Sequence, residues 1–327
     1  MHKYKILLEY DGTNYRGWQT QKNARSVQDT LITAAEKFLD APVKIQGAGR
    51  TDAGVHALEQ TAHLETSKKV HPESLRMRIN DNLPTSVNVL KVENAPALFH
   101  ARHHAISRSY LYLISRRRTA FGKRYVWWVK DKLDCGKMKQ ALDVFQGFHD
   151  FASFADKRMD KDASTQVNIE AVHLKDFDGL IALRVVGSHF LWKMVRRIVG
   201  VTVEAGRNNF TKHDIEKMLI PIRFQRVTRR RGGDEAYCTY VEEADDAANK
   251  VSQIKHIGIN SYSELPARYT APPSGLFLEK VLYEGDRLPP IKPPIYLHDV
   301  PQIQDTKKAG DKGMWIKTNI DYTAFCP

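Results

Sequence analysis

The sequence predicts an α+β protein in which two halves share one sheet. Strand-like and helix-like segments follow one another twice along the chain, with a boundary near residue 105. The chain has 327 residues, 42% apolar and 27% charged, which is enough for a substantial hydrophobic core. We expect no membrane segment, because no apolar run approaches the roughly 20 residues that a spanning helix needs.

The first half, residues 1–105, begins with a strand over residues 4–10 that stops at the turn signal Asp11-Gly12. A helix is predicted over residues 27–39, with Ser26 as its N-cap and Asp29 as the capping-box partner. Its apolar side chains fall on one face: Val27, Leu31, Ala34, Ala35 and Phe38. Three further strands are expected, over residues 43–45, 61–64 and 87–92.

The second half, residues 106–285, repeats this order loosely. We predict a strand over 106–115, a helix over 137–148, and a hairpin of residues 167–174 and 180–186 around Asp178-Gly179. A helix is predicted over residues 189–203. On a helical wheel its apolar stripe (Leu191, Met194, Val195 and Ile198) lies opposite three basic residues, Lys193, Arg196 and Arg197.

The character of the chain changes after residue 222. Residues 223–268 form a charged insertion, in which the arginine-rich run 223–231 either grips RNA or is a charged loop. Another strand is expected over residues 275–283. Residues 286–327 are a proline-containing tail that either wraps the surface or is mobile.

Charge points to a nucleic acid partner. Lys and Arg total 50 against 38 for Asp and Glu, a net charge of +12. Residues 94–130 contain eight Lys or Arg, including Arg102, but no Asp or Glu, and aromatic residues interleave with them. The alternative is a solvated basic face with core aromatics. Three scattered cysteines and no signal peptide lead us to expect a reduced, cytoplasmic protein.

The segment most informative about chemistry is residues 47–57, Gly-Ala-Gly-Arg-Thr-Asp-Ala-Gly-Val-His-Ala. Its glycine spacing fits neither a dinucleotide-binding fingerprint nor a P-loop. A glycine-rich loop with Asp52 as a turn former is one interpretation. The other is catalytic: a carboxylate beside Arg50 should stay ionised, and a fixed carboxylate is a competent nucleophile or base.

Residues 49–57 resemble the signature of the TruA-type tRNA pseudouridine synthases. Further matches follow in order along the chain, at Asp11–Gln19, Ser26–Gln28, Phe99–Arg102, Arg108–Tyr112, Phe148–Phe154, Phe190–Gly200 and Ala271–Leu278. The resemblance covers residues 4 to about 222 and again 270 to 285. It does not extend to the insertion or the tail, which leaves the substrate range and the assembly open.

The resemblance implies the pseudouridine synthase fold: two similar ferredoxin-like halves, a mostly antiparallel sheet flanked by helices, and a basic central cleft holding Asp52. It implies an isomerase that converts uridine to pseudouridine in the anticodon stem-loop of tRNA, at positions 38–40, by flipping the base out of its stack. It further implies no metal or other cofactor, and a homodimer that binds one tRNA across both subunits.

Site residues are carried over position by position. Asp52 is the expected catalytic aspartate, Arg196 its pairing arginine, and Tyr110 the tyrosine that stacks on the base and assists proton removal. The expected RNA-binding residues are Arg50, Tyr110, Leu276, Arg197 and Arg102, of which Leu276 makes an apolar contact to the base. Two alternatives stay open: the same chemistry on another RNA, and a non-catalytic tRNA-binding or tRNA-folding protein.

Overall fold

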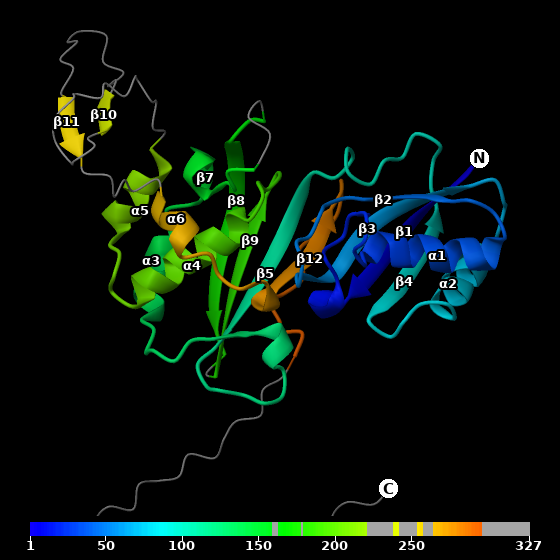
Figure 1. The fold of residues 1–327 in the computed structure, drawn as a ribbon, viewed down its shortest axis with the longest axis horizontal. Coiled ribbons are helices and arrows are strands. Elements are labelled where there is room, and N and C mark those ends of the chain that lie inside the picture. The colour runs from blue at the N-terminus through cyan, green and yellow to red at the C-terminus, as the bar shows by residue number, and fades with distance from the viewer. Residues whose placement is uncertain (159–162, 178, 221–237, 242–253, 258–263, 296–327) are drawn as a thin grey trace, which may run out of the picture. The chain divides into compact units, whose positions relative to one another are not determined.

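Strands from both halves form one mixed, mostly antiparallel sheet. The computed structural model describes residues 1–158, 163–177, 179–220, 238–241, 254–257 and 264–295. The sheet order is β4-β1-β3-β12-β5-β9-β8-β7, with β2 beside β3 and β6 beside β5 (Figure 1). The strands are β1 (His2–Tyr10), β2 (Lys44–Gly47), β3 (His56–Thr66), β4 (Val87–Asn94), β5 (Ser107–Ser115), β6 (Trp127–Trp128), β7 (Gly147–Asp150), β8 (Gln166–Asp176), β9 (Leu180–Gly187) and β12 (Leu276–Leu282). The predicted α+β class is confirmed.

The first half follows the predicted local signals closely. Helix α1 (Val27–Leu39) has the predicted bounds, and the Ser26 side chain caps it by accepting a hydrogen bond from the backbone N–H of Asp29. Tyr4, Ile6, Leu8 and Tyr10 of β1 alternate with half-exposed residues, so one face of the strand packs against the core. Helix α2 (Pro72–Asn80) was not predicted.

The second half corrects two helix predictions. Helix α3 (Cys135–Asp143) ends before residue 148, because Gly147–Asp150 pairs with β8 as a strand. Helix α4 (Met194–Gly206) begins five residues later than expected, because Lys193 has a φ of 64°, which a continuous right-handed helix does not allow. The smaller elements here are α5 (Lys212–Leu219), α6 (Leu265–Arg268), and the pair β10 (Cys238–Val241) and β11 (Ile254–Ile257).

Strand β12 joins the two halves of the sheet. It runs parallel to β3, with Phe277 opposite His56, and antiparallel to β5, with Leu278 opposite Tyr110. A segment from the end of the described chain therefore lies between the N-terminal and C-terminal strands (Figure 1). The predicted strand over residues 275–283 is confirmed, whereas a division into domains at residue 105 stays a prediction.

A buried ion pair links β9 to β12 across the intervening β5. Arg184 and Glu279 are each 5% exposed in their side chains, and the Arg184 Nε donates to Glu279 Oε2 at 2.7 Å. The Ser109 hydroxyl of β5 donates to the same carboxylate oxygen at 2.6 Å. These bonds satisfy the buried charges and fix the neighbouring strands in register.

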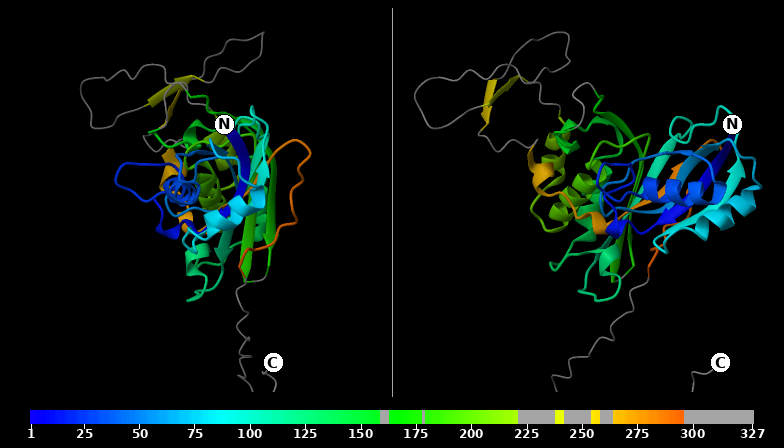
Figure 2. Two further views of the ribbon diagram at one scale, coloured as in Figure 1. Left: turned by 90° about the vertical axis from the view of Figure 1, so that its right-hand side faces the viewer. Right: turned by 45° about the vertical axis from the view of Figure 1, so that its right-hand side comes forward.

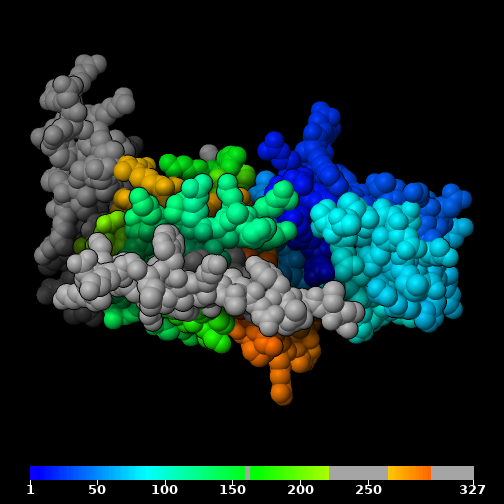
Figure 3. Space-filling view, turned by 90° about the horizontal axis from the view of Figure 1, so that it is seen from below, coloured from blue at the N-terminus to red at the C-terminus, as the bar shows by residue number. Residues whose placement is uncertain are grey.

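The segment after β12 covers part of the helix-free face of the sheet (Figures 2 and 3). A second apolar cluster lies there, which includes Leu111, Leu113 and Phe277, and Ile291 and Ile295 pack against it. For residues 286–295 the structure therefore supports wrapping rather than mobility. The rest of the tail and the arginine-rich run 223–231 lie outside the described residues, as does most of the insertion.

Candidate active site

Asp52 lies in the loop between β2 and β3. Residues 15–18, which follow β1, form backbone hydrogen bonds with this loop. The backbone N–H of Trp18 donates to the Thr51 carbonyl at 3.0 Å, and that of Gly54 donates to the Tyr15 carbonyl at 3.3 Å. Glycine is required at Gly17, which has a φ of 106° and on which a Cβ would lie 2.5 Å from the Thr51 carbonyl oxygen. The close approach of these backbones holds Asp52 in place.

Arg196, on the first turn of α4, is the partner of Asp52. Its NH1 lies 3.7 Å from Asp52 Oδ2, and the side chains are 14% and 28% exposed. The Arg196 Nε donates to the Ala271 carbonyl at 2.6 Å, while the Arg196 carbonyl accepts from the Ala271 N–H at 3.0 Å. The helix thus carries the guanidinium to a carboxylate that is distant in sequence, and the segment before β12 fixes its orientation.

The electrostatics of Asp52 involve Arg196, the pairing arginine that the resemblance implied, and not the expected effect of Arg50. Burial raises the pKa of Asp52, and the negative charge of Asp156 adds to this rise, while the charges of Arg196 and Lys193 and the polar Trp192 side chain oppose it. Arg50, expected to keep the carboxylate ionised, is exposed and does not act on Asp52 in this way. The cation that pairs with Asp52 therefore comes from Arg196 rather than from the sequence neighbour.

Tyr110 and Leu276 lie on the adjacent strands β5 and β12, where Leu276 is opposite Tyr112. Both belong to the main hydrophobic core, and Tyr110 is 9% exposed with its ring packed edge-on against Phe190. Burial, reinforced by the negative charge of Asp52, raises the pKa of Tyr110 to about 12. Tyr110 is therefore a neutral phenol beside a carboxylate.

Arg197 and Arg102 do not join this group. Arg197 is 6% exposed, and its NH1 donates to the backbone carbonyls of Ser153 and Ala155. The helical wheel placed Arg197 opposite the apolar stripe, but the side chain is buried, because nearly every residue of α4 is buried rather than one stripe; its expected contact with RNA stays a prediction. Arg102 is exposed, and its carbonyl accepts a hydrogen bond from Arg108 at 2.8 Å.

Comparison with known proteins identifies the family to which this chain belongs. The tRNA pseudouridine synthase family profile matches residues 6–104 and 141–226. The chain belongs to this family. Relatives named tRNA pseudouridine synthase A occur in Maricaulis maris, 37% identical over 74% of this chain and 98% of the relative, and in Thermodesulfovibrio yellowstonii, 32% identical over 86% of this chain and 100% of the relative. A third, from Beijerinckia indica, is 37% identical over 77% of this chain and 98% of its own length.

Pseudouridine synthases are isomerases that convert uridine to pseudouridine in tRNA, so this chain is an enzyme of the isomerase class. Its sheet, flanked by helices, is consistent with the pseudouridine synthase fold. One solved structure, described as an unknown protein from Galdieria sulphuraria, aligns over 64% of this chain and 93% of its own length, at 13% identity and a TM-score of 0.18.

Sequence analysis missed a group of side chains beside the Asp52–Arg196 pair, which we name the Asp156 cluster: Asp156, Arg158, Trp192 and Lys193. The Lys193 Nζ lies 2.7 Å from Asp156 Oδ2, and the Arg158 guanidinium lies 4.2 Å from the centre of the Trp192 ring. Trp192 and Lys193 stand inside the matched segment Phe190–Gly200, and that position was the available signal. The sequence gives no such signal for Asp156 and Arg158, because their role depends on contacts with Lys193 and Trp192, which are more than 30 residues away in the chain.

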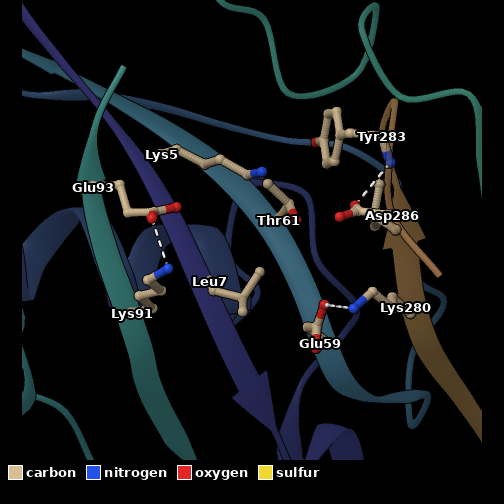
Figure 4. A pocket seen from close by; sticks show the side chains of 10 residues that line it. Lys5, Leu7, Glu59, Thr61, Lys91, Glu93, Lys280, Tyr283 and Asp286 are labelled. Atoms are coloured by element: carbon tan, nitrogen blue, oxygen red, sulfur yellow. Dashed lines mark hydrogen bonds and ion pairs between the residues drawn. The ribbon is translucent and has the colours of Figure 1, made fainter. Parts of the chain in front are cut away.

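Two other features of the described residues can be compared with the Asp52 site: groups that could hold a metal ion, and a hollow on the sheet. These residues contain no cluster of three or more His, Cys, Asp or Glu with the geometry to hold a metal ion. A hollow on the sheet (Figure 4) pairs Lys280 with Glu59 at 3.1 Å and Lys91 with Glu93 at 2.6 Å. Its charges are thus largely matched internally, and it includes none of the predicted site residues. Within the described part of the chain, no helix is long and apolar enough to span a membrane.

Proposed function

We propose that this chain isomerises uridines in the anticodon stem-loop of tRNA, at positions 38–40, with Asp52 as its catalytic residue. The observation that carries the proposal is the pairing of Asp52 with Arg196 at 3.7 Å, with Tyr110 beside them. A loop is the part of tRNA in which a uridine leaves its stack at the lowest cost, about a few kcal/mol. The positive charge of the chain, +12, favours binding to the phosphate backbone.

The reaction breaks the bond between ribose C1′ and uracil N1 and forms a bond between C1′ and C5. N1 gains a proton and C5 loses one, so the atoms balance without an oxidant or reductant. Asp52, ionised beside Arg196, either attacks the nucleotide or assists elimination of the base. Arg50 is exposed next to Asp52 and suits a phosphate of the flipped nucleotide.

Tyr110 supports the base by stacking rather than by ionising. Its pKa of about 12 keeps the phenol neutral at physiological pH, and the charge of Asp52 opposes loss of its proton. Leu276, on the neighbouring strand and in the same core, supplies an apolar contact to the same base. The flipped uracil base is then bound by shape and by stacking on Tyr110, and the phosphate groups are bound by the arginines.

The test is to incubate wild-type enzyme and Asp52→Ala with unmodified tRNA, without added cofactor, and to map pseudouridine base by base. We expect product at positions 38–40 with wild type alone, and similar tRNA affinity for both, since the arginine contacts persist. Asp81→Ala, at an exposed carboxylate of the pair with Arg78, is the matched control. Product at other tRNA positions or in other RNAs would redirect the substrate assignment. Tight binding without product would favour a tRNA-binding protein.

We further propose a cytoplasmic homodimer that binds one tRNA across both subunits. This proposal is supported by the family resemblance and by the positive charge of the chain. Light scattering of the purified enzyme, alone and with tRNA, would give two chains per particle if the proposal is right. A particle of one chain, with full activity, would contradict it.

A further inference from the structure

Asp156 is the centre of the cluster beside Asp52. It is 7% exposed, and its carboxylate accepts hydrogen bonds from Arg158 Nε at 3.0 Å and NH2 at 3.2 Å, and pairs with Lys193 Nζ at 2.7 Å. Its backbone N–H donates to the Trp192 carbonyl at 3.1 Å. The buried carboxylate of Asp156 therefore holds two cations, and the backbone N–H of the same residue holds the backbone of Trp192.

The loop that carries Asp156 is held in place by hydrogen bonds from α4. Arg197 on α4 donates to the carbonyls of Ser153 and Ala155, directly before Asp156 in the chain. Arg158, two residues after Asp156, lies over the Trp192 ring, with its guanidinium carbon 4.2 Å from the ring centre. The position of Asp156 is therefore set by α4, the same helix that carries Arg196.

Lys193 reaches this cluster through an unusual backbone conformation. Its φ of 64° and ψ of 3° are left-handed, a region that a side chain with a Cβ seldom occupies. Such conformations persist where surrounding contacts enforce them, and they concentrate at functional sites. At this position the contact that fixes the side chain is the ion pair with Asp156, with the side chain of Lys193 27% exposed.

The cluster faces Asp52. The positive charge of Lys193 and the Trp192 side chain lower the pKa of Asp52 against the effect of burial, whereas the negative charge of Asp156 is a smaller influence that raises this pKa. The charged and titratable groups around Asp52 come from three elements: Arg196 and Lys193 at the start of α4, Asp156 and Arg158 after the short helix Ala152–Phe154, and Tyr110 of β5.

We propose that Asp156 is a positioning residue: it holds Lys193 and Trp192 against Asp52, so that the carboxylate stays ionised and oriented as the substrate base excludes water from the site. The proposal deepens and rests on the proposed isomerase function. Asp156 itself need not touch the RNA, since its lone pairs are already occupied by Arg158 and Lys193.

The experiment compares four variants in single-turnover reactions on unmodified tRNA: Lys193→Met, Lys193→Arg, Asp156→Asn and the double variant Asp156→Asn/Lys193→Met. Lys193→Met should lower the rate about tenfold at neutral pH. It should also move the acidic limb of the rate–pH profile to higher pH, because Asp52 loses a stabilising cation. Lys193→Arg, which keeps the charge and can still pair with Asp156, should restore most of the rate.

Asp156→Asn should slow the reaction because Lys193 and Trp192 lose their position, and this outweighs the smaller direct effect by which the Asp156 charge raises the pKa of Asp52. The double variant should therefore be within about twofold of the slower single variant. Asp143→Asn, which breaks an exposed pair with Lys139 on α3, is the matched control and should behave as wild type. In all variants the Kd for tRNA should stay within about threefold of wild type, because the other phosphate contacts persist.

Two results would overturn the positioning role: an unmoved acidic limb in Lys193→Met, or rate losses that multiply in the double variant. Either would leave the isomerase function intact, since wild type is active in the same assay. If wild type produced no pseudouridine on any tRNA, the proposed function would fall, and the positioning role with it.

Discussion

Replacing Arg196 by methionine tests whether the ion pair with Asp52 sets the ionisation of the catalytic carboxylate. The substitution keeps the length of the aliphatic stem but removes the charge that lies 3.7 Å from Asp52 and the hydrogen bond to the Ala271 carbonyl. Burial already raises the pKa of Asp52, and Arg196 is the largest opposing influence. Without it, the protonated and unreactive form of Asp52 should persist to higher pH.

The size of the effect follows from the distance and the exposure. Two unit charges about 4 Å apart attract by about 4 kcal/mol at an effective dielectric constant near 20. Because Asp52 is 28% exposed, we reduce this to about 2 kcal/mol for screening by water. Since about 1.4 kcal/mol corresponds to a tenfold change, Arg196→Met should move the acidic limb of the rate–pH profile up by about 1.5 pH units.

The assay is release of tritium from uridine C5 in tRNA, measured as single-turnover rates from about pH 5 to about pH 9. Arg196→Lys, which retains a cation, should move the limb less. The matched control is Arg207→Met, at the other end of α4, where the side chain is 27% exposed and pairs with Asp131 at 2.8 Å. A limb that stays in place in Arg196→Met, or moves equally in Arg207→Met, would refute the reasoning.

Three further predictions concern stability, each measured by urea unfolding. Gly200→Ala should cost at least about 1–3 kcal/mol, because a Cβ there would lie 1.4 Å from the Tyr269 carbonyl oxygen; an unchanged midpoint would contradict this close packing. Glu279→Gln should cost about 3 kcal/mol, since it leaves the buried guanidinium of Arg184 without its counter-charge, and a loss below about 1 kcal/mol would contradict that. For Asp52, burial raises the folded-state pKa above the unfolded value, so stability is highest below the unfolded pKa and falls as pH rises through the folded pKa. The Asp52→Asn variant does not undergo this loss, so its stability relative to wild type should increase as pH rises above the unfolded pKa of Asp52; a difference that is constant with pH would argue against a raised pKa.

Local patterns predicted the first half well because they act over a few residues. The cap of α1 needs only Ser26 and the residues up to Asp29, and its predicted bounds match the structure. The strand predicted over residues 4–10, which stops at the Asp11-Gly12 turn signal, likewise matches β1. Where a single backbone angle overrides the pattern, as at Lys193, the helix begins later than its apolar periodicity suggested.

The sequence by itself determined the α+β class, the order of most strands and helices, and the loop that carries Asp52, because caps, turns and alternation are encoded within short segments. It also supplied the family resemblance, and with it Asp52, Arg196 and Tyr110 as candidates. Only the tertiary structure showed how α4 brings Arg196 to 3.7 Å from Asp52, that Arg197 is buried, and that Asp156 pairs with Lys193. These contacts join residues far apart in the chain, so they depend on how strands pair across the two halves and on where α4 packs, and no local periodicity records either.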